Sequence, residues 1–313
     1  MRYPNIDIAK LFMAFCVVAI HVAKLSNYIM PPVLEYTVRL AVPFFLVVSG
    51  FFLYPKLFDH NNKDRGRVLL KYLKMYVVWT LVYLPFAVLY YYRASYSVAD
   101  AVLEYFNNFL FTGETPLAWH MWYMHTLIVS VFLLWLLSYT RIGIEIFSSI
   151  VFFVALSLDV VNAFDLHILE PIVSWAGDGQ NFVLTGLPAL CLGILVKKYN
   201  DNVVKNTPPQ AVLTFSICSL LCIWLFVIDI HFYCIIFSGL LYMLILKLPQ
   251  ISGNTYIWRE CSKYVYFLHL LIAFLLRSRF DNVFIYWLVV AGVTMVLSIV
   301  LYYWLERIRR IHA

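Results

Sequence analysis

Apolar residues form long runs along almost the whole chain, separated by short polar stretches. Read in windows of roughly 17 to 25 residues, these runs predict ten helices long enough to cross a bilayer. The predicted spans are 6–25, 36–56, 69–92, 120–138, 142–160, 182–197, 210–228, 230–247, 263–277 and 283–304. The pattern therefore predicts an all-α, polytopic membrane protein in which residues 1–313 form a single transmembrane domain.

Two of the predicted connections are longer than the others. In the connection 93–119, apolar residues recur every three or four positions between Ser97 and Phe106, which predicts an interfacial helix. The connection 161–181 has no Lys or Arg but carries Asp165, His167, Glu170 and Asp178. This acidic loop shapes an acceptor entrance or is simply solvated, and both interpretations stay open.

Composition and charge give the topology. Hydrophobic residues make up 63% of the chain and charged residues 13%, which excludes a soluble globular domain. Of the 23 Lys and Arg residues, 18 fall on one side of the ten spans and 5 on the other. This asymmetry predicts that both termini are cytoplasmic. The net charge of +6 does not indicate nucleic acid, because these residues do not share a soluble face.

The cysteines and histidines do not have the spacing of a metal site. All six cysteines lie within or beside apolar runs, where they are typical of small core residues. Cys218 and Cys222 are four residues apart, but two thiols without a second pair are a weak zinc signal. The sequence also lacks His-x3-His and Glu-x2-His pairs, so we expect no metal.

The first span carries Asp7, Lys10 and His21 in an otherwise apolar helix. Ionisable residues inside a membrane rarely face lipid, which favours a site lined by protein. Alternatively, Asp7 and Lys10 lie at the headgroups and His21 only bonds a neighbouring carbonyl. His21 is 11 residues beyond Lys10, or about 16 Å, and lies in the outer half of the bilayer. A cofactor with phosphates at the inner face and an arm like the phosphopantetheine of coenzyme A fits this spacing.

A basic cluster lies at the start of the third span. Lys71 and Lys74 are three residues apart on one helix face, slightly inside the apolar boundary. Together with Lys10 they are candidates for a cytoplasmic phosphate site. The alternative is that they only satisfy the positive-inside rule.

Further histidines occur in the fourth and ninth spans. The run Trp119–His125 places His120 near the outer boundary and His125 about a turn deeper, so His120 could share an outer cavity with His21. Its aromatic residues also suit an interfacial belt. His269 lies near the middle of the ninth span. Three intramembrane histidines equally suit a proton relay or a transporter.

Five segments resemble the acyltransferase-3 family of integral membrane O-acyltransferases, which modify bacterial surface sugars and related acceptors. They are Asp7, Lys10 and His21 in register, Arg39–Phe52, Lys71–Trp79, His120–Tyr123 and Tyr266–His269. Lys10 stands where the family more often has arginine. Lysine keeps the charge but loses the bidentate fork, so a planar contact at this position is in doubt.

The resemblance implies transfer of an acyl group, commonly acetyl from acetyl-CoA, to a hydroxyl acceptor. His21 would be the general base or a transient acyl carrier, with His120 and Arg39 as further catalytic candidates. Arg39 equally suits a snorkelling interfacial arginine. The implied cofactor-binding residues are Asp7, Lys10, Ser49, Lys71 and Lys74, and the implied substrate-binding residues are Trp122, Tyr123 and His269. Ser49 precedes Gly50, so this pair equally suits close helix packing.

The leading hypothesis is thus an acetyl-CoA-dependent O-acyltransferase in the inner membrane of a bacterium. Its acceptor would be a surface glycan or a lipid-linked sugar at the outer face, and its partners would be that acceptor and membrane lipid. The alternative is a transporter or delivery domain for serine or another small solute, as in similar membrane domains fused to racemases.

Overall fold

A computed structural model describes residues 3–58, 65–163, 182–200, 206–214, 217, 231–277 and 279–311. The described secondary structure is helical apart from one isolated bridge between Thr115 and Ala118. The chain divides into two compact units, and each is described by itself. Unit 1 comprises Met1–Phe45 and Leu244–Ala313, and unit 2 comprises Leu46–Met243.

The all-helical membrane class predicted from the sequence is confirmed. Within the described residues, five helical stretches are long and apolar enough to cross a membrane: Pro4–Leu25, Pro32–Leu57, Arg65–Arg93, Trp119–Leu137 and Val283–Ile311. The total of ten spans and the cytoplasmic position of both termini stay predictions. The predicted span 210–228 lies mostly outside the described residues.

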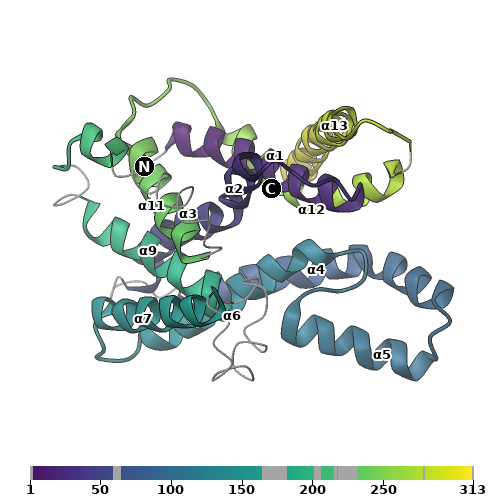
Figure 1. The fold of residues 1–313 in the computed structure, drawn as a ribbon, viewed down its shortest axis with the longest axis horizontal. Coiled ribbons are helices and arrows are strands. Elements are labelled where there is room, and N and C mark those ends of the chain that lie inside the picture. The colour runs from purple at the N-terminus through teal and green to yellow at the C-terminus, as the bar shows by residue number, and fades with distance from the viewer. Residues whose placement is uncertain are drawn as a thin grey trace. The chain divides into compact units, whose positions relative to one another are not determined.

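Unit 1 is built around two neighbouring helices, α1 (Pro4–Leu25) and α12 (Tyr256–Leu276). α12 also packs against α13 (Val283–Ile311), and α1 contacts the short helix α2 (Pro32–Arg39) (Figure 1). α1 begins at a proline, whose fixed φ suits the first turn of a helix. α12 begins seven residues before its predicted start at 263, because its first two turns carry ion-paired charges that a hydropathy window excludes.

The predicted span 36–56 is divided in two. α2 ends at Arg39 and α3 (Ala41–Leu57) begins two residues later. Pro43 has no backbone N–H, so it cannot bond the carbonyl of Arg39 four residues earlier. The break therefore follows from a proline that the hydropathy pattern alone does not register.

The described part of unit 2 contains most of α3 and five further long helices. They are α4 (Arg65–Arg93), α6 (Trp122–Leu137), α7 (Ile144–Ala163), α9 (Leu187–Lys198) and most of α11 (His231–Lys247). A π-helical turn, η4 (Phe182–Gly186), precedes α9 and contacts α6 and α7. α4 packs against α6, and α7 packs against α9. Asp159 on α7 accepts a hydrogen bond of 2.8 Å from the backbone N–H of Phe232 and so caps the start of α11.

α3 and α9 approach each other through two glycines. A Cβ atom built on Gly50 would lie 2.2 Å from the carbonyl oxygen of Leu190, and one on Gly193 would lie 1.9 Å from that of Val47. Real side chains cannot occupy either position, so the backbones themselves are in contact. Small residues that allow such an approach are typical of packed membrane helices.

α4 and α6 run antiparallel in a constant register. At one end Arg65 donates a hydrogen bond of 3.2 Å to the carbonyl of Ser138. Further along, the rings of Tyr76 and His125 lie 6.4 Å apart and those of Tyr83 and His120 lie 5.2 Å apart. Each pair has residue numbers that add up to almost the same value, as an antiparallel pair of helices requires.

This register places His120 level with Tyr83 on α4. Tyr83, its neighbour, is 10 residues before Arg93, or about 15 Å along α4. The intervening chain returns alongside α4 (Figure 1) as α5 (Val98–Asn107) and the π-helical turn η1 (Asn108–Thr112). Tyr76 donates a hydrogen bond of 2.8 Å to the carbonyl of Phe109. The interfacial position of the segment 97–106 and the position of His120 near the outer boundary stay predictions.

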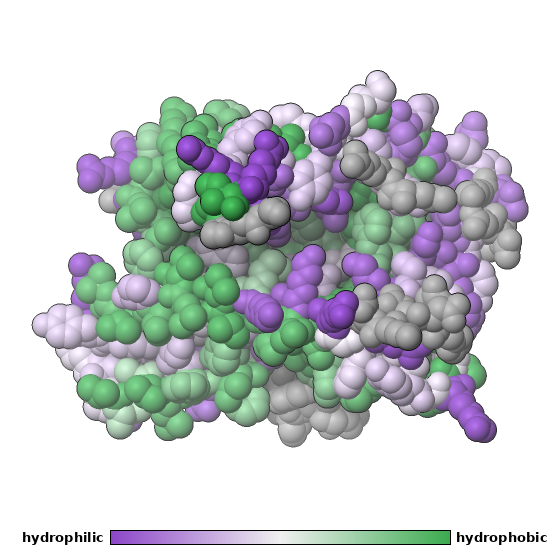
Figure 2. Space-filling model, turned by 180° about the vertical axis from the view of Figure 1, so that it is seen from behind, coloured by the Kyte–Doolittle hydropathy of each residue, from purple (hydrophilic) through white to green (hydrophobic). Residues whose placement is uncertain are grey.

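Apolar side chains cover much of the face shown in Figure 2. On α4 the exposed residues include Val78, Leu81 and Val88, and on α13 they include Val296 and Val300. Large exposed apolar surfaces are unusual on soluble monomers but suit contact with lipid tails.

Candidate functional site

Two histidines from distant parts of the sequence meet in unit 1. The ring centroids of His21 on α1 and His269 on α12 are 5.1 Å apart, and the rings are inclined by 40°. His269 is completely buried and His21 is partly buried. Burying polar groups between two apolar helices is costly unless these groups bond one another or a ligand. The two histidines are therefore a candidate functional site.

The orientation of His269 is set by its own helix. Its Nδ1 atom lies 2.7 Å from the carbonyl oxygen of Tyr266 and 3.1 Å from that of Val265. A carbonyl only accepts hydrogen bonds, so Nδ1 must carry the proton. In the neutral ring Nε2 is then the basic nitrogen. These bonds fix both the tautomer and the direction of the imidazole next to His21.

A second polar contact joins the same two helices near their first residues. The hydroxyl of Thr255 donates a hydrogen bond of 2.8 Å to Oδ2 of Asp7. Asp7 and His21 are 14 residues apart, and so are Thr255 and His269. α1 and α12 therefore run parallel and in register. The two contacts are separated by about 21 Å along the helices.

Asn5 reinforces this end of α1 and was not identified from the sequence. Its Nδ2 donates to the carbonyls of Pro249 at 3.0 Å and Leu248 at 3.4 Å, and its Oδ1 accepts from the N–H of Ile251 at 3.1 Å. The side chain is buried. An asparagine beside a sequence motif has no distinctive signal, since the carbonyls it bonds are 243 or more residues away.

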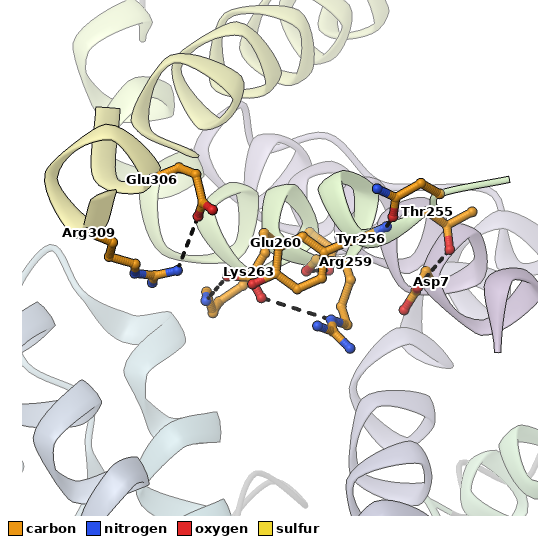
Figure 3. A network of polar contacts seen from close by, with 10 residues as sticks. Asp7, Thr255, Tyr256, Arg259, Glu260, Lys263, Glu306 and Arg309 are labelled. Carbon is orange, nitrogen blue, oxygen red and sulfur yellow. Dashed lines mark hydrogen bonds and ion pairs between the residues drawn. The ribbon is translucent and has the colours of Figure 1, made fainter. Parts of the chain in front are cut away.

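Charged residues follow Thr255 along α12 (Figure 3). Lys263 bonds Glu260 at 2.5 Å, Arg259 lies 3.9 Å from the same carboxylate, and the Arg259 guanidinium lies over the ring of Tyr256 at 4.6 Å. On α13, Arg309 pairs with Glu306 at 3.6 Å. Asp7 thus lies near an end of unit 1 that is rich in both signs of charge, whereas the histidine pair is in its apolar core.

Arg39 lies on the exposed face of α2. Its guanidinium bonds Glu35 one turn earlier at 2.6 Å, and 43% of its side chain is exposed. An exposed ion pair of this kind suits the interfacial alternative and contributes little to stability. A catalytic role for Arg39 stays a prediction.

Unit 2 gathers a second set of predicted residues. The side chains of Ser49 and Tyr123 are hydrogen-bonded, and Tyr72 lies close to Tyr123. Lys56 lies within electrostatic range of Lys71. Both ammonium groups repel each other there, which favours binding of an anion between them. The sequence prediction included Lys71 but not Lys56 in the phosphate site.

The remaining predicted residues are less clearly grouped. Lys74 is exposed on α4, and Trp122 is buried at the start of α6. Lys10 is partly buried on α1. Their proposed roles, and a cavity shared by His120 and His21, stay predictions. Among the described residues there is no group of three or more His, Cys, Asp or Glu that could hold a metal ion. Most of the acidic loop 161–181 lies outside the described residues.

Comparison with known proteins places this geometry in context. The profile of a family described as the acyltransferase domain matches residues 3–303, almost the whole chain. The chain belongs to the acyltransferase-3 family. The resemblance drawn from five short motifs is therefore confirmed. No solved structure matches the chain significantly.

The acyltransferase-3 chain is also similar to curated racemases. It is 29% identical over 221 residues to an amino-acid racemase of Enterococcus faecalis, covering 66% of this chain and 30% of that protein. It is 31% identical over 222 residues to a serine/alanine racemase of Enterococcus gallinarum, covering 64% of this chain and 30% of that protein. The chain thus spans less than a third of the length of these curated relatives.

Proposed function

We propose that the chain is a membrane O-acyltransferase that moves an acetyl group from cytoplasmic acetyl-CoA to a hydroxyl of a surface glycan or a lipid-linked sugar. The observation that carries this proposal is the His21–His269 pair, held in an apolar helix pair of a chain that belongs to the acyltransferase-3 family. Imidazole is the side chain best suited to accept a proton near neutral pH.

The proposed reaction is an ester exchange. His21 accepts the proton of the acceptor hydroxyl as its oxygen attacks the thioester carbonyl. When the carbon–sulfur bond breaks, the imidazolium returns this proton to the departing thiolate. In the alternative, His21 carries the acyl group transiently and then passes it to the hydroxyl. In both cases the fixed ring of His269 orients His21.

We further propose that Lys71 and Lys74 bind the phosphates of acetyl-CoA, assisted by Lys10, while Ser49 lies near its arm. Asp7 then contributes to the donor-binding region mainly by holding Thr255, whose hydroxyl donates a hydrogen bond to its carboxylate. Support comes from the charge asymmetry, from Lys56 close to Lys71, and from the Ser49–Tyr123 bond on a neighbouring part of unit 2.

Donor binding tests this function. Purified protein in detergent should unfold at a higher temperature with acetyl-CoA, because a ligand at 100 times its Kd stabilises the native state by about 2.7 kcal/mol. Replacing Lys71 and Lys74 by glutamine should weaken acetyl-CoA binding at least tenfold. Arg93→Gln, at the other end of α4, is the matched control and should bind normally. Wild-type protein that shows no stabilisation by acetyl-CoA contradicts the proposal.

A second candidate function is favoured by the racemase relatives. In this alternative the membrane domain delivers serine or another small solute, and the histidines line its path. Uptake of labelled serine by sealed vesicles in the absence of acetyl-CoA supports this function. Uptake equal to that of protein-free vesicles excludes it for serine.

A further inference from the structure

A polar cleft lies at one end of unit 1. The parallel helices α1 and α12 end there at Leu25 and Leu276, and α13 begins there at Val283. The cleft is lined by residues 26–28, which follow α1, and by residues 281–284 at the start of α13, and its volume is about 530 Å³. Sites for small ligands usually have volumes of about 300 to 1,000 Å³, so the cleft is large enough to hold one.

One wall of the cleft is the turn that ends α1. The N–H of Tyr28 donates a hydrogen bond of 2.9 Å to the carbonyl of Ala23, and the N–H of Asn27 donates one of 3.3 Å to that of Lys24. Asn27 has the left-handed conformation, with φ of 50°. These are the bonds of a Schellman helix end, in which asparagine replaces the usual glycine. They fix the backbone that carries Asn27 and Tyr28.

The opposite wall is the capped start of α13. Oδ1 of Asn282 accepts hydrogen bonds from the N–H groups of Phe284 at 2.9 Å and Ile285 at 3.1 Å. Asp281 is exposed immediately before this cap. Both walls are thus held by helix-end hydrogen bonds before a ligand arrives, which lowers the entropic cost of binding one.

The side chains of the lining suit a sugar. They include one carboxylate and two carboxamides, and these groups between them accept and donate hydrogen bonds, as hydroxyl groups require. Tyr28 and Phe284 are 44% and 61% exposed, and their rings offer apolar surface to the C–H face of a sugar ring. None of the described residues that line the cleft is Lys or Arg. A phosphate would therefore meet the carboxylate of Asp281 without a neighbouring countercharge in the lining, so a neutral sugar fits better than an anionic lipid headgroup.

The cleft is at the same end of α1 as the histidine pair. Ser26 follows His21 by five residues, or about 7.5 Å along the helix. Reacting atoms must come within about 3 to 3.5 Å of each other, so a sugar in the cleft is too far away to be the one that reacts. Asp7 lies at the opposite end of α1, and the charge asymmetry predicts that the cleft opens on the non-cytoplasmic side.

We propose that this cleft binds a sugar unit of the acyl acceptor next to the unit that carries the reacting hydroxyl. Asp281 and Asn27 bind its hydroxyl groups, and the aromatic rings contact its apolar face. The assignment of this sugar to an acyl acceptor rests on the proposed function, whereas the binding of a sugar by the cleft does not.

Acylation in cells tests the role of the cleft. Asn27→Gly keeps the left-handed turn, because glycine adopts positive φ readily, and Asp281→Ala removes the carboxylate. Each should lower the ester-bound acetate on surface glycans tenfold or more while stabilisation of the purified protein by acetyl-CoA stays unchanged. Ile29→Ala and Arg279→Gln are the matched controls, because both side chains are exposed beside the lining residues and neither lines the cleft. Wild-type levels of ester-bound acetate in both cleft variants overturn the proposal.

Sugar binding is measured separately from acylation. The probes are fluorescently labelled oligosaccharides made by partial hydrolysis of the surface polysaccharide of the expressing cells, and binding to purified protein in detergent is followed by fluorescence anisotropy. Wild-type protein and the two controls should bind them, and the two cleft variants should bind at least tenfold more weakly. No binding by the wild type, or equal binding by the cleft variants, overturns the sugar site. If the cleft variants alone lose binding but wild-type cells gain no ester-bound acetate, the sugar site stands and the acyltransferase proposal fails.

Discussion

His21→Ala is expected to lower acyl transfer by a factor of 10² to 10⁴, which is the range that a positioned general base contributes. The buried ring of His269 lies beside that of His21. Among the described residues, no other imidazole ring contacts either of them. Water is a much weaker base than imidazole, so it cannot replace the lost group. If His21 is instead the acyl carrier, the loss should be at least as large.

Acyl transfer by His21→Ala is measured with labelled acetyl-CoA in membranes containing equal amounts of each variant. His21→Gln keeps most of the side-chain volume and should be equally inactive, which separates loss of the imidazole from a packing defect. Phe12→Ala on the same helix, where the side chain is 59% exposed, should remain active. Both His21 variants should still be stabilised by acetyl-CoA. Transfer by His21→Ala at the wild-type rate removes His21 from the reaction.

Gly193→Ala is expected to produce the largest loss of stability. The new methyl group would lie 1.9 Å from the carbonyl oxygen of Val47 and 2.9 Å from the backbone nitrogen of Phe51. Backbone atoms cannot rotate away as a side chain can, so α3 and α9 must separate. Overpacking in a core typically costs 1 to 3 kcal/mol, and we expect about 3 kcal/mol or more here.

Thermal unfolding in detergent, followed by size-exclusion chromatography of the folded fraction, measures this effect. Gly292→Ala on α13 is the matched control, because nothing lies within 4 Å of its Cβ position. That control should be neutral or more stable by about 1 kcal/mol, since alanine has the higher helix propensity. Equal unfolding temperatures for the two variants contradict the close backbone contact of α3 and α9.

Hydropathy predicted most of the helices but little of how they meet. The limits of α1, α7 and α11 agree with the predicted spans to within three residues, because each is a single apolar run. α12 was cut short at its charged start, where Glu260 and Lys263 are paired on one helix face. Hydropathy averages treat such residues as polar whether or not they are paired.

Contacts between distant parts of the chain were the feature that the sequence predicted least well. The segment before α6 is apolar and amphipathic, so an interfacial helix and a re-entrant one have the same pattern. The contacts of Tyr76 with Phe109 and of Tyr83 with His120, which join α4 to this part of the chain, could not be read from that pattern. Similarly, His21 and His269 were each recognisable as candidates, but their contact spans 248 residues and follows from the parallel register of α1 and α12. Asn5 belongs to no motif, and its contacts were found only from the structure.

Transfer of acetyl groups across the membrane of sealed inside-out vesicles tests the central claim most directly. Labelled acetyl-CoA is supplied at the exposed cytoplasmic face, and free coenzyme A thiol and ester-bound acetate on enclosed glycans are measured together. The acyltransferase proposal predicts equal amounts of the two products with wild-type protein and neither with His21→Ala. Movement of serine without consumption of acetyl-CoA, and no ester-bound acetate, would contradict it.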